Sequence, residues 1–479
     1  MQPAIRKFVL LFAASLAFHL AGSWTLPLID RDEPRFAEAS REMLQRGDYV
    51  VPYFNNRYRF DKPPLTYWVH TVSYRLLGDN DFAARFPSAV AASLVALLLL
   101  GWGWRIGGER VGWYSAVIFT LSLQTLMHAK AAVADMWLVL FVTAAHWAGY
   151  ELLRDRLGGE PTAAQRRWWW LFYISLGLAF LAKGPVGWTP LLTLAATKLF
   201  LPNAQLNRRF LFFTGVIFAV SIVAMWGIPA LQRTQGEFFR IGIGRHVVER
   251  SVVAMEGHGA SSILGYIASL PFFFITVFLS FAPWSVRLPW LTRKLWRNRD
   301  PLDNYLVAGA AVIFIIFTLV KTKLPHYTLP AFPLLALLLA RHLPEHNRFV
   351  RRAAIGFAIV ALLAAAATPF AAHLFPSWNL ARQARAELKR EMEFGAIGYR
   401  EPSLVWYFRR HIEGFMTDLD ERSAPEFMQR PGPRFVVMPT AVAARLYPNL
   451  PDGWKQYTAR GFSTASGRWV ELTLLLKPS

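Results

Sequence analysis

Charged side chains crowd the stretch that follows the first apolar segment of the chain. In LIDRDEPRFAEASREM, residues 28–43, Asp32 and Glu33 precede Pro34, and Arg35 follows. A carboxylate beside hydrocarbon is costly unless it has a partner or a task. Asp32 and Glu33 therefore either cap a helix or include a general base that acts on an acceptor at the membrane surface, and both are catalytic candidates.

Lysines stand at rigid corners between apolar segments. Lys62 precedes two prolines in RFDKPPLTYW, Lys183 precedes Gly-Pro in FLAKGPVG, and Lys321 and Lys323 lie in KTKLPHY. We expect these corners to share one face and, with Arg35, to bind the phosphate or pyrophosphate of a lipid. Lysines that merely reach lipid headgroups would give the same pattern.

Asp135 begins a long apolar segment in HAKAAVADMW, with Lys130 within reach on the same stretch. An ionisable group at membrane depth is a functional candidate by default, so Asp135 is a third catalytic candidate, with an ion pair to Lys130 or to an arginine of another loop as the alternative. The sequence contains no GxxxxGK[ST], no GxGxxG after a strand and no GxSxG. We therefore expect no nucleotide cofactor. His246 and His258 lie in a long outer loop, where a histidine with a carboxylate could bind a divalent metal.

Long apolar segments must position these residues. The chain is 54% hydrophobic and 17% charged, with a mean hydropathy of +0.28. Bilayer-crossing helices need about 20 apolar residues. We expect a polytopic α-helical membrane protein with about 11–13 transmembrane helices, of which the segments around 168–201 could be re-entrant. The segments are 7–29, 88–104, 111–127, 131–152, 168–182, 185–201, 210–231, 262–284, 304–320, 326–341 and 353–374.

The net charge of +21 could indicate nucleic acid, but its distribution indicates a membrane. Basic clusters occur in every second loop, at 105–110, 154–167, 208–209, 287–299 and 341–352. This is the positive-inside bias, which predicts a cytoplasmic N-terminus and a C-terminus outside. The first segment could be a signal peptide, but its length and the polytopic chain favour an uncleaved anchor. The chain has no cysteine, which excludes disulfides.

The chain divides into a transmembrane domain, residues 1–374, and a small α/β domain outside the membrane, residues 375–479. The first outer loop, residues 30–86, begins with a predicted helix that Gly47 ends and that lies on the membrane surface. In the second domain, ARQARAELKREMEF predicts an amphipathic helix. SLVWYF, RFVVMPT and WVELTLLLK predict strands.

Five motifs together resemble the bacterial lipid A aminoarabinose transferases and their relatives. They are DRDEPRFAEASREM, RFDKPPLTYW, LAFLAKGPVG, KTKLPHYTLP and EPSLVWYF. These enzymes belong to the GT-C superfamily of polyprenyl-phosphate-dependent glycosyltransferases, which includes the protein O-mannosyltransferases. The resemblance implies that Asp32 and Asp135 are the family's aspartates and that Asp61, Lys62 and Pro63 form its acidic-Lys-Pro motif. It further implies that Asp61, where the family commonly has Glu, and His246 hold a divalent metal.

The resemblance implies an integral enzyme of the bacterial inner membrane, with the C-terminus in the periplasm. It would move a sugar from undecaprenyl phosphate to an envelope acceptor such as a lipid A phosphate, with inversion at the anomeric carbon. The alternatives are protein O-mannosylation, transfer to another envelope glycan, and transport of a lipid-linked sugar. Transporters favour charges near the bilayer midplane, whereas here the charges lie at the outer ends of the segments.

Overall fold

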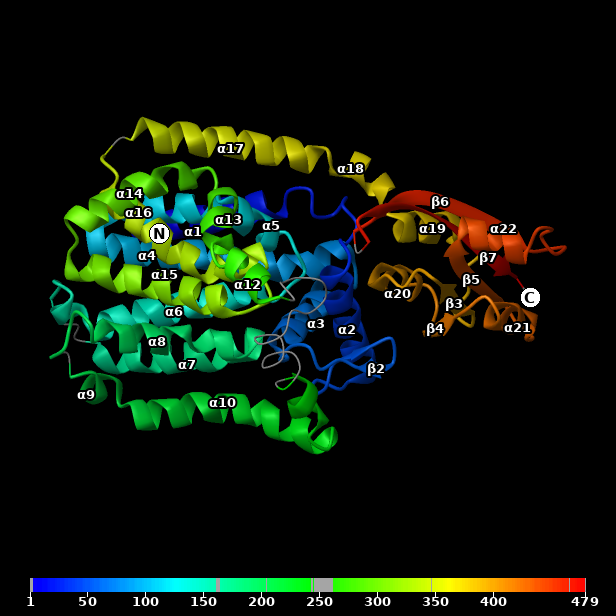
Figure 1. Ribbon diagram of the computed structural model, residues 1–479, viewed down its shortest axis with the longest axis horizontal. Helices are drawn as coiled ribbons and strands as arrows, with labels where there is room; N and C mark the ends of the chain where they lie inside the picture. The colour runs from blue at the N-terminus through cyan, green and yellow to red at the C-terminus, as the bar shows by residue number, and fades with distance from the viewer. Residues whose placement is uncertain are drawn as a thin grey trace.

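The structure is a computed structural model that describes residues 3–160, 164–203, 205–242, 244, 262–345, 347–464 and 466–478. A bundle of long helices forms one half of the molecule and an α/β part forms the other, with the N-terminal loop segments between them (Figure 1). A helix lies in each of the eleven apolar segments predicted from the sequence. The bundle helices are α1 (Pro3–Leu20), α4 (Asp81–Thr120), α5 (Leu123–Ala129), α6 (Asp135–Leu152), α7 (Gln165–Lys183), α8 (Thr189–Thr197), α9 (Leu206–Phe210), α10 (Phe212–Arg233), α12 (Ile263–Ser269), α13 (Phe272–Ser280), α14 (Leu288–Arg297), α15 (Pro301–Leu319), α16 (Phe332–His342) and α17 (Arg348–Ala366).

Within the described residues, five helical segments are both long and apolar enough to cross a membrane: 81–120, 212–233, 263–280, 301–319 and 348–366. The segments 212–233, 263–280 and 348–366 are mostly unburied by protein, so apolar side chains cover the outside of the bundle. Such an apolar exterior is stable against lipid and not against water. The chain is therefore a polytopic membrane protein.

Helix α4 contains a reversal at Gly107 and Gly108. Gly108 has a φ of 78°, a conformation that suits glycine and strains other residues. The two arms then approach so closely that a Cβ atom on Gly103 would lie 2.6 Å from the Cα atom of Gly112. The Ser115 hydroxyl donates to the Leu99 carbonyl across the same contact, at 3.1 Å. The predicted segments 88–104 and 111–127 thus form an antiparallel pair.

The basic loops gather at the end of the bundle that holds this reversal. Arg105 contacts Glu151 at 2.5 Å, and Arg209 contacts Asp155 at 2.6 Å. Glu151 lies in the last turn of α6, whereas Asp135 is its first residue. At 1.5 Å per residue, the 18 residues of α6 separate this basic end from Asp135 by about 27 Å.

The first outer loop folds into α2 (Asp32–Arg46), β1 (Tyr53–Phe54), β2 (Arg57–Tyr58) and α3 (Leu65–Leu77). Helix α2 begins with two acidic residues and ends at Gly47, whose φ is 65°, as the sequence predicts. Its position differs from the prediction of a helix lying on the membrane surface. Residues of α2 are buried on all sides, because α2 contacts α3 in the same loop and α20 (Pro402–Phe408) in the α/β part.

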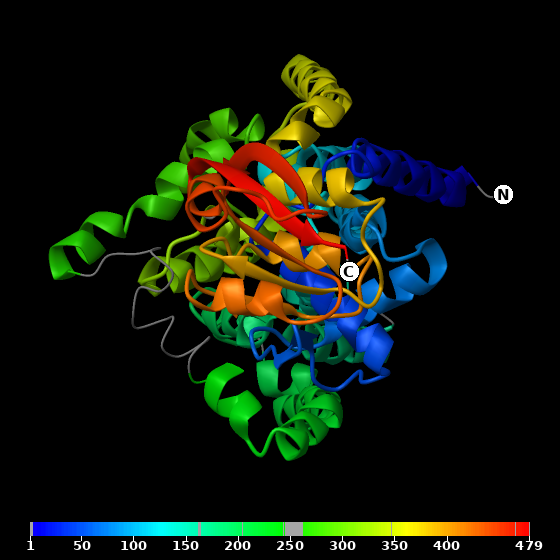
Figure 2. The same cartoon turned by 90° about the vertical axis from the view of Figure 1, so that its right-hand side faces the viewer.

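The C-terminal part is a five-stranded sheet of order β4-β3-β5-β7-β6, flanked by short helices. The strands β4, β3 and β5 are parallel, and β7 pairs antiparallel with β5 and β6. Viewed along the long axis, this part lies over one end of the bundle (Figure 2). Its elements are α19 (Pro376–Ala384), β3 (Glu393–Ile397), α20, β4 (Met416–Leu419), α21 (Ser423–Gln429), β5 (Arg434–Pro439), α22 (Thr440–Leu446), β6 (Lys455–Ser463) and β7 (Arg468–Lys477).

Two of the three predicted strands are confirmed, as β5 and β7, and the third is wrong. The segment SLVWYF forms helix α20, which starts with Pro402 and is buried over its full length. A short apolar run buried on every side has no periodicity that separates strand from helix, and Pro402 at the first helical turn decides for the helix. The amphipathic helix predicted over 381–394 is also shorter than expected, because α19 ends at Ala384 and β3 begins at Glu393.

Candidate functional site

Two cavities open side by side where the bundle meets the first outer loop. The first, of about 720 Å³, lies among α6, α7, α10 and α15 and is lined mostly by apolar side chains such as Phe180, Trp188, Trp226 and Phe317. We call it the apolar cavity. The second, of about 750 Å³, is lined by Asp32, Arg35 and other charged side chains from the first outer loop. We call it the polar cavity.

Seven residues line both cavities and so form a shared wall: Phe60, Asp61, Lys62, Asp135, Lys183, His326 and Tyr327. They come from four segments that are distant in sequence, namely the 59–64 corner, the start of α6, the end of α7 and the 3-10 helix at Pro325–Ala331. Four charged residues singled out in the sequence meet in this wall: Asp61, Lys62, Asp135 and Lys183.

Three ion pairs hold the shared wall. The Lys183 ammonium donates to the Asp135 carboxylate at 2.5 Å, and both side chains are largely buried. The Lys62 ammonium donates to Asp61 at 2.9 Å, and Arg59 donates to the other oxygen of Asp61 at 3.0 Å. An acidic residue at the start of α6 and a basic residue at the end of α7 both complement the helix dipoles. Lys183 therefore takes the place of Lys130, the partner expected for Asp135.

Lys130 has a different task. Its ammonium donates to the carbonyls of Phe18 and His19 at 3.1 and 3.0 Å, and to that of Ala21 at 2.5 Å. These carbonyls belong to the last turn of α1 and the residue after it, which an α-helix leaves without partners. Lys130 thus anchors the end of α1.

Asp32 and Glu33 are neighbours in sequence with different surroundings. Asp32 is exposed and lines the polar cavity, as Arg35 does. Glu33 is 4% exposed and lines neither cavity. Its two carboxylate oxygens accept from Arg85 at 2.9 and 2.8 Å and from the backbone N–H groups of Ile29 and Ala132, both at 2.8 Å. Glu33 thus joins the start of α2 to the chain at Ile29, Arg85 and Ala132.

The KTKLPHY motif divides in the same way. His326 and Tyr327 line both cavities, whereas Lys321 and Lys323 line neither of them. The Lys323 ammonium donates to the carbonyls of Phe317, at 3.1 Å, and Thr318, at 2.5 Å, in the last turn of α15. A lysine in this position satisfies the free carbonyls at the end of a helix.

Among the described residues, a group that can hold a metal lies beside the shared wall, with two of its three members in the wall, and does not include Asp61. His128, Asp135 and His326 each offer a ligand atom, and these atoms lie within 4.8 Å of one another. Asp61 instead contacts the two cations Lys62 and Arg59. His246, its expected partner, lies outside the described residues. Sequence reasoning did not select His128 and His326, although both occur within the motifs HAKAAVADMW and KTKLPHY.

The α/β part reaches the polar cavity through a contact that the sequence did not indicate. Thr464 lines this cavity, and its hydroxyl donates to the Asp30 carbonyl at 2.9 Å. The Asp30 carboxylate accepts from the Ser403 N–H at 2.9 Å. Burial and the nearby Glu401 carboxylate raise the pKa of Asp30 to about 7.

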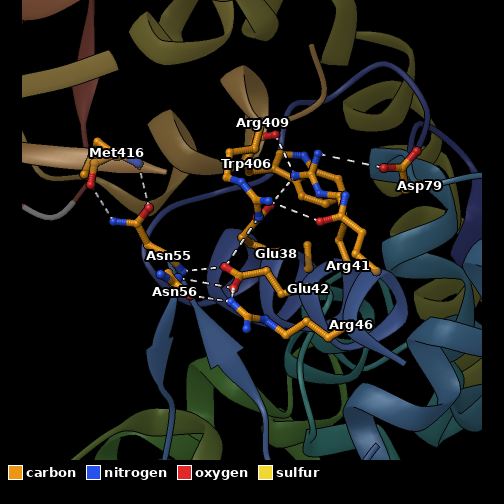
Figure 3. Close-up of polar contacts among 12 residues, drawn as sticks. Glu38, Arg41, Glu42, Arg46, Asn55, Asn56, Asp79, Trp406, Arg409 and Met416 are labelled. Carbon is orange, nitrogen blue, oxygen red and sulfur yellow. Dashed lines mark hydrogen bonds and ion pairs between the residues drawn. The ribbon is translucent and has the colours of Figure 1, made fainter. Parts of the chain in front are cut away.

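A buried network of charges fixes α2, whose first residue is Asp32, to the α/β part (Figure 3). The Glu38 carboxylate accepts from Arg41 within α2 and from Arg409, just after α20. Arg41 also donates to the Trp406 carbonyl at 2.7 Å. Asn55, in the turn between β1 and β2, exchanges two hydrogen bonds of 2.8 Å with the backbone of Met416. This network holds the two parts together at the polar cavity, which is lined by residues of both parts.

Comparison with known proteins agrees with this arrangement. Residues 61–228 match the family model of the dolichyl-phosphate-mannose-protein mannosyltransferases. The structure resembles that of ArnT from Cupriavidus metallidurans bound to undecaprenyl phosphate, with a TM-score of 0.80 over 97% of each chain at 21% identity. The archaeal oligosaccharyltransferase AglB from Archaeoglobus fulgidus is more distant, with a TM-score of 0.56 over 98% of this chain and 74% of that one, at 12% identity. Residues 61–228 are thus similar to this family, and the chain shares the fold of these two structures.

Two curated relatives of this chain have the same description. The undecaprenyl phosphate-alpha-4-amino-4-deoxy-L-arabinose arabinosyl transferase of Pectobacterium atrosepticum is 30% identical over 338 residues. The same description applies to a relative from Edwardsiella ictaluri, which is 32% identical over 329 residues. The alignments cover 69% and 64% of this chain. The chain spans only 57% and 54% of the length of these two relatives.

Proposed function

We propose that this protein is a membrane glycosyltransferase that moves a sugar from undecaprenyl phosphate, or a similar polyprenyl phosphate, to an acceptor of the cell envelope such as a lipid A phosphate. One observation carries the proposal: the shared wall, in which each lysine is paired with a carboxylate, separates the apolar cavity from the polar cavity. A lipid-linked sugar has an isoprenoid chain, a phosphate and a polar sugar in that order. The two cavities and the wall supply surroundings for the three parts in the same order.

In this proposal the lysines of the shared wall bind the donor phosphate. Lys62 and Lys183 each donate to one carboxylate in the wall, Asp61 and Asp135, which hold them in place. A fixed ammonium stabilises the negative charge that builds on the phosphate as the glycosidic bond breaks. Each lysine carries three N–H donors, so it can keep its carboxylate contact and still donate to the phosphate.

Asp32 acts on the acceptor from the polar cavity. Its exposed carboxylate either takes the proton of an acceptor hydroxyl or, if the acceptor is an ionised phosphate, orients it through a bound hydroxyl group. Arg35, in the same cavity, supplies a positive charge for an anionic acceptor or for the donor. Attack from the polar cavity, opposite to the phosphate, inverts the anomeric carbon.

Of the other residues selected from sequence, two receive structural tasks in this proposal and a third receives none. Glu33 joins Arg85 to the loop backbone, Lys323 completes the end of α15, and Lys321 lines neither cavity. Asp135 acts mainly by holding Lys183. No nucleotide cofactor takes part.

The positive-inside rule gives the proposed orientation. The basic end of the bundle, with Arg105 and Arg209, faces the cytoplasm, and Lys7 of α1 belongs to this end through its contact with Glu109. The site and the α/β part, residues 375–479, then face the periplasm of a bacterial inner membrane, with residues 1–374 as the membrane domain.

A transfer assay with purified protein in lipid nanodiscs tests the proposal. The donor is undecaprenyl phosphate-aminoarabinose, the acceptor is lipid A, and mass spectrometry detects the product. Asp32→Asn and Lys62→Ala should each lower the transfer rate by about 100-fold or more, the usual effect of removing an electrostatic or acid–base group. Lys321→Ala, a basic residue that lines neither cavity, is the matched control. Near wild-type rates in both site variants would refute the assignment.

The family model supports a second candidate, protein O-mannosylation, because it describes dolichyl-phosphate-mannose-protein mannosyltransferases. Donor and acceptor can be exchanged independently in the same assay. Transfer from polyprenyl phosphate-mannose to a serine- and threonine-containing peptide, without transfer to lipid A, would decide for this candidate. Mass spectrometry of lipid A and of total glycoprotein from a deletion strain gives the corresponding answer in cells.

A further inference from the structure

Two residues of the shared wall, Asp135 and His326, form a group with His128 that has the composition of a metal site. His128 lies in the last turn of α5, His326 lies in the 3-10 helix Pro325–Ala331, and Asp135 starts α6. Their ligand atoms lie within 4.8 Å of one another, and the two imidazole rings have centroids 4.9 Å apart. We propose that His128, Asp135 and His326 bind one divalent cation with the ligand preference of Zn²⁺.

The surroundings of His128 leave one ring nitrogen for a metal. Its Nδ1 atom lies 3.2 Å from the Gln124 backbone carbonyl, which can only accept. A proton on Nδ1 satisfies that carbonyl and leaves the lone pair on Nε2. The Gln124 side-chain amide, 3.0 Å from the same Nδ1, then presents its oxygen, since the two orientations of an amide are interchangeable. Metal-bound histidines usually donate their second N–H in this way, to a backbone carbonyl or a carboxylate.

Asp135 can ligate the ion without losing Lys183. A carboxylate has two oxygens, and the lysine contacts one of them, Oδ1, at 2.5 Å. The ion pair keeps the carboxylate ionised, which metal binding requires. Lys183 thus orients the ligand from the second layer around the ion, as hydrogen-bond donors to metal-bound carboxylates commonly do.

The three ligand atoms need to approach one another only slightly to bind one ion, and they leave its fourth coordination position open. Ligand atoms about 2.0–2.1 Å from a tetrahedral Zn²⁺ are about 3.3 Å apart, so the side chains must approach by at most about 1.5 Å. Two histidines and one carboxylate are a known ligand set for zinc sites that keep a fourth position open. Asp135 and His326 line both cavities, so that position faces a bound ligand.

The charges of the wall indicate which ligand completes the site. Lys183 already balances Asp135, and Lys62 lies in the same wall, so a divalent cation adds positive charge that the protein does not neutralise. A phosphate group neutralises it. If the proposed donor binds here, the ion and the polyprenyl phosphate should increase each other's affinity, by about fivefold or more.

Zinc binding to the whole protein tests this inference. Tag-free protein in nanodiscs is stripped with a chelator and titrated with Zn²⁺ against a fluorescent chelator, and the bound metal is counted by mass spectrometry. We expect one ion per chain in the presence of undecaprenyl phosphate, and a loss of affinity of at least about 100-fold in His128→Ala and His326→Ala. His326→Gln, of similar size, replaces the alanine variant if that variant does not fold.

Three variants are matched controls. His373→Ala removes an exposed histidine outside the site and should keep the ion. The variants Asp61→Asn and His246→Ala should also keep the ion. Metal binding that is lost in these two variants but kept in His128→Ala and His326→Ala overturns the inference. The absence of a bound ion also overturns it. The experiment measures bound metal, so a failed transfer assay would not contradict the metal site. Sugar transfer by metal-free protein would likewise not contradict the proposed function.

Discussion

The neighbouring carboxylates Asp32 and Glu33 give the sharpest test of the assignment of roles. Glu33 is 4% exposed and accepts four hydrogen bonds, two from Arg85, which is 1% exposed. In Glu33→Gln, an NH₂ group replaces one carboxylate oxygen. Both oxygens accept from N–H groups, so the NH₂ group faces N–H donors in either orientation of the amide. Arg85 then stays buried with its charge unbalanced.

The expected cost follows from this loss. Breaking a buried ion pair by removing one partner costs about 3–5 kcal/mol. At about 2 °C per kcal/mol, the apparent melting temperature of Glu33→Gln should fall by about 6–10 °C. Asp32→Asn, an exposed change, should shift it by less than about 1 °C, since surface substitutions usually stay within about 0.5 kcal/mol.

Differential scanning fluorimetry in nanodiscs measures the two melting temperatures, and the transfer assay is run well below both. We expect the Glu33→Gln protein to transfer sugar at more than about a tenth of the wild-type rate per folded molecule, whereas Asp32→Asn loses about 100-fold. A Glu33→Gln protein that is as stable as wild type but inactive would refute the reasoning. Glu33 would then be a catalytic group, the alternative raised by the sequence.

The remaining predictions concern the junction of the two parts and the reversal in α4. Asp30→Asn should raise the apparent melting temperature relative to wild type at pH 8 but not at pH 4. The raised pKa of Asp30 means that the stabilising effect of its neutral carboxyl is lost as the pH rises from about 4 through about 7. An equal shift of the melting temperature at both pH values contradicts this. Arg409→Ala should lower the free energy of unfolding by about 3–5 kcal/mol, since it leaves the buried Glu38 without its second cation. Limited trypsin digestion should then release the α/β part faster than in an Arg410→Ala control. Gly108→Ala should cost about 1 kcal/mol, measured as a fall in melting temperature, because Gly108 has a φ of 78°; no change would mean that the reversal tolerates a side chain.

Local sequence signals predicted the helices well. Apolar segments of membrane length located the bundle helices apart from the short helices α9 and α14, and Gly47 and the acidic residues at 32–33 set the bounds of α2. These features depend on residues close in sequence. For the same reason, the alternating strand WVELTLLLK was found, whereas the fully buried SLVWYF was not, since its burial comes from α2 and the sheet and not from its own pattern.

The site was predicted in part, and the limit has a physical cause. The ionisable residues at the ends of apolar segments, Lys62, Asp135 and Lys183, were found because charge is expensive there. Their pairing was not, because the partner of Asp135 is 48 residues away and depends on how α6 packs against α7. Thr464 and His128 carry no such signal, because a hydroxyl and an imidazole are common in any context. Only the fold brings Thr464 to the polar cavity and His128 close to Asp135 and His326.

The shared wall also limits the order of events in the proposed reaction. The two cavities adjoin through one layer of side chains, and each has its own set of further lining residues. Two substrates can therefore occupy the protein together, without one leaving before the other arrives. Kinetics with both concentrations varied should accordingly give intersecting reciprocal plots, the pattern of a ternary complex, rather than the parallel lines of a glycosylated-enzyme intermediate.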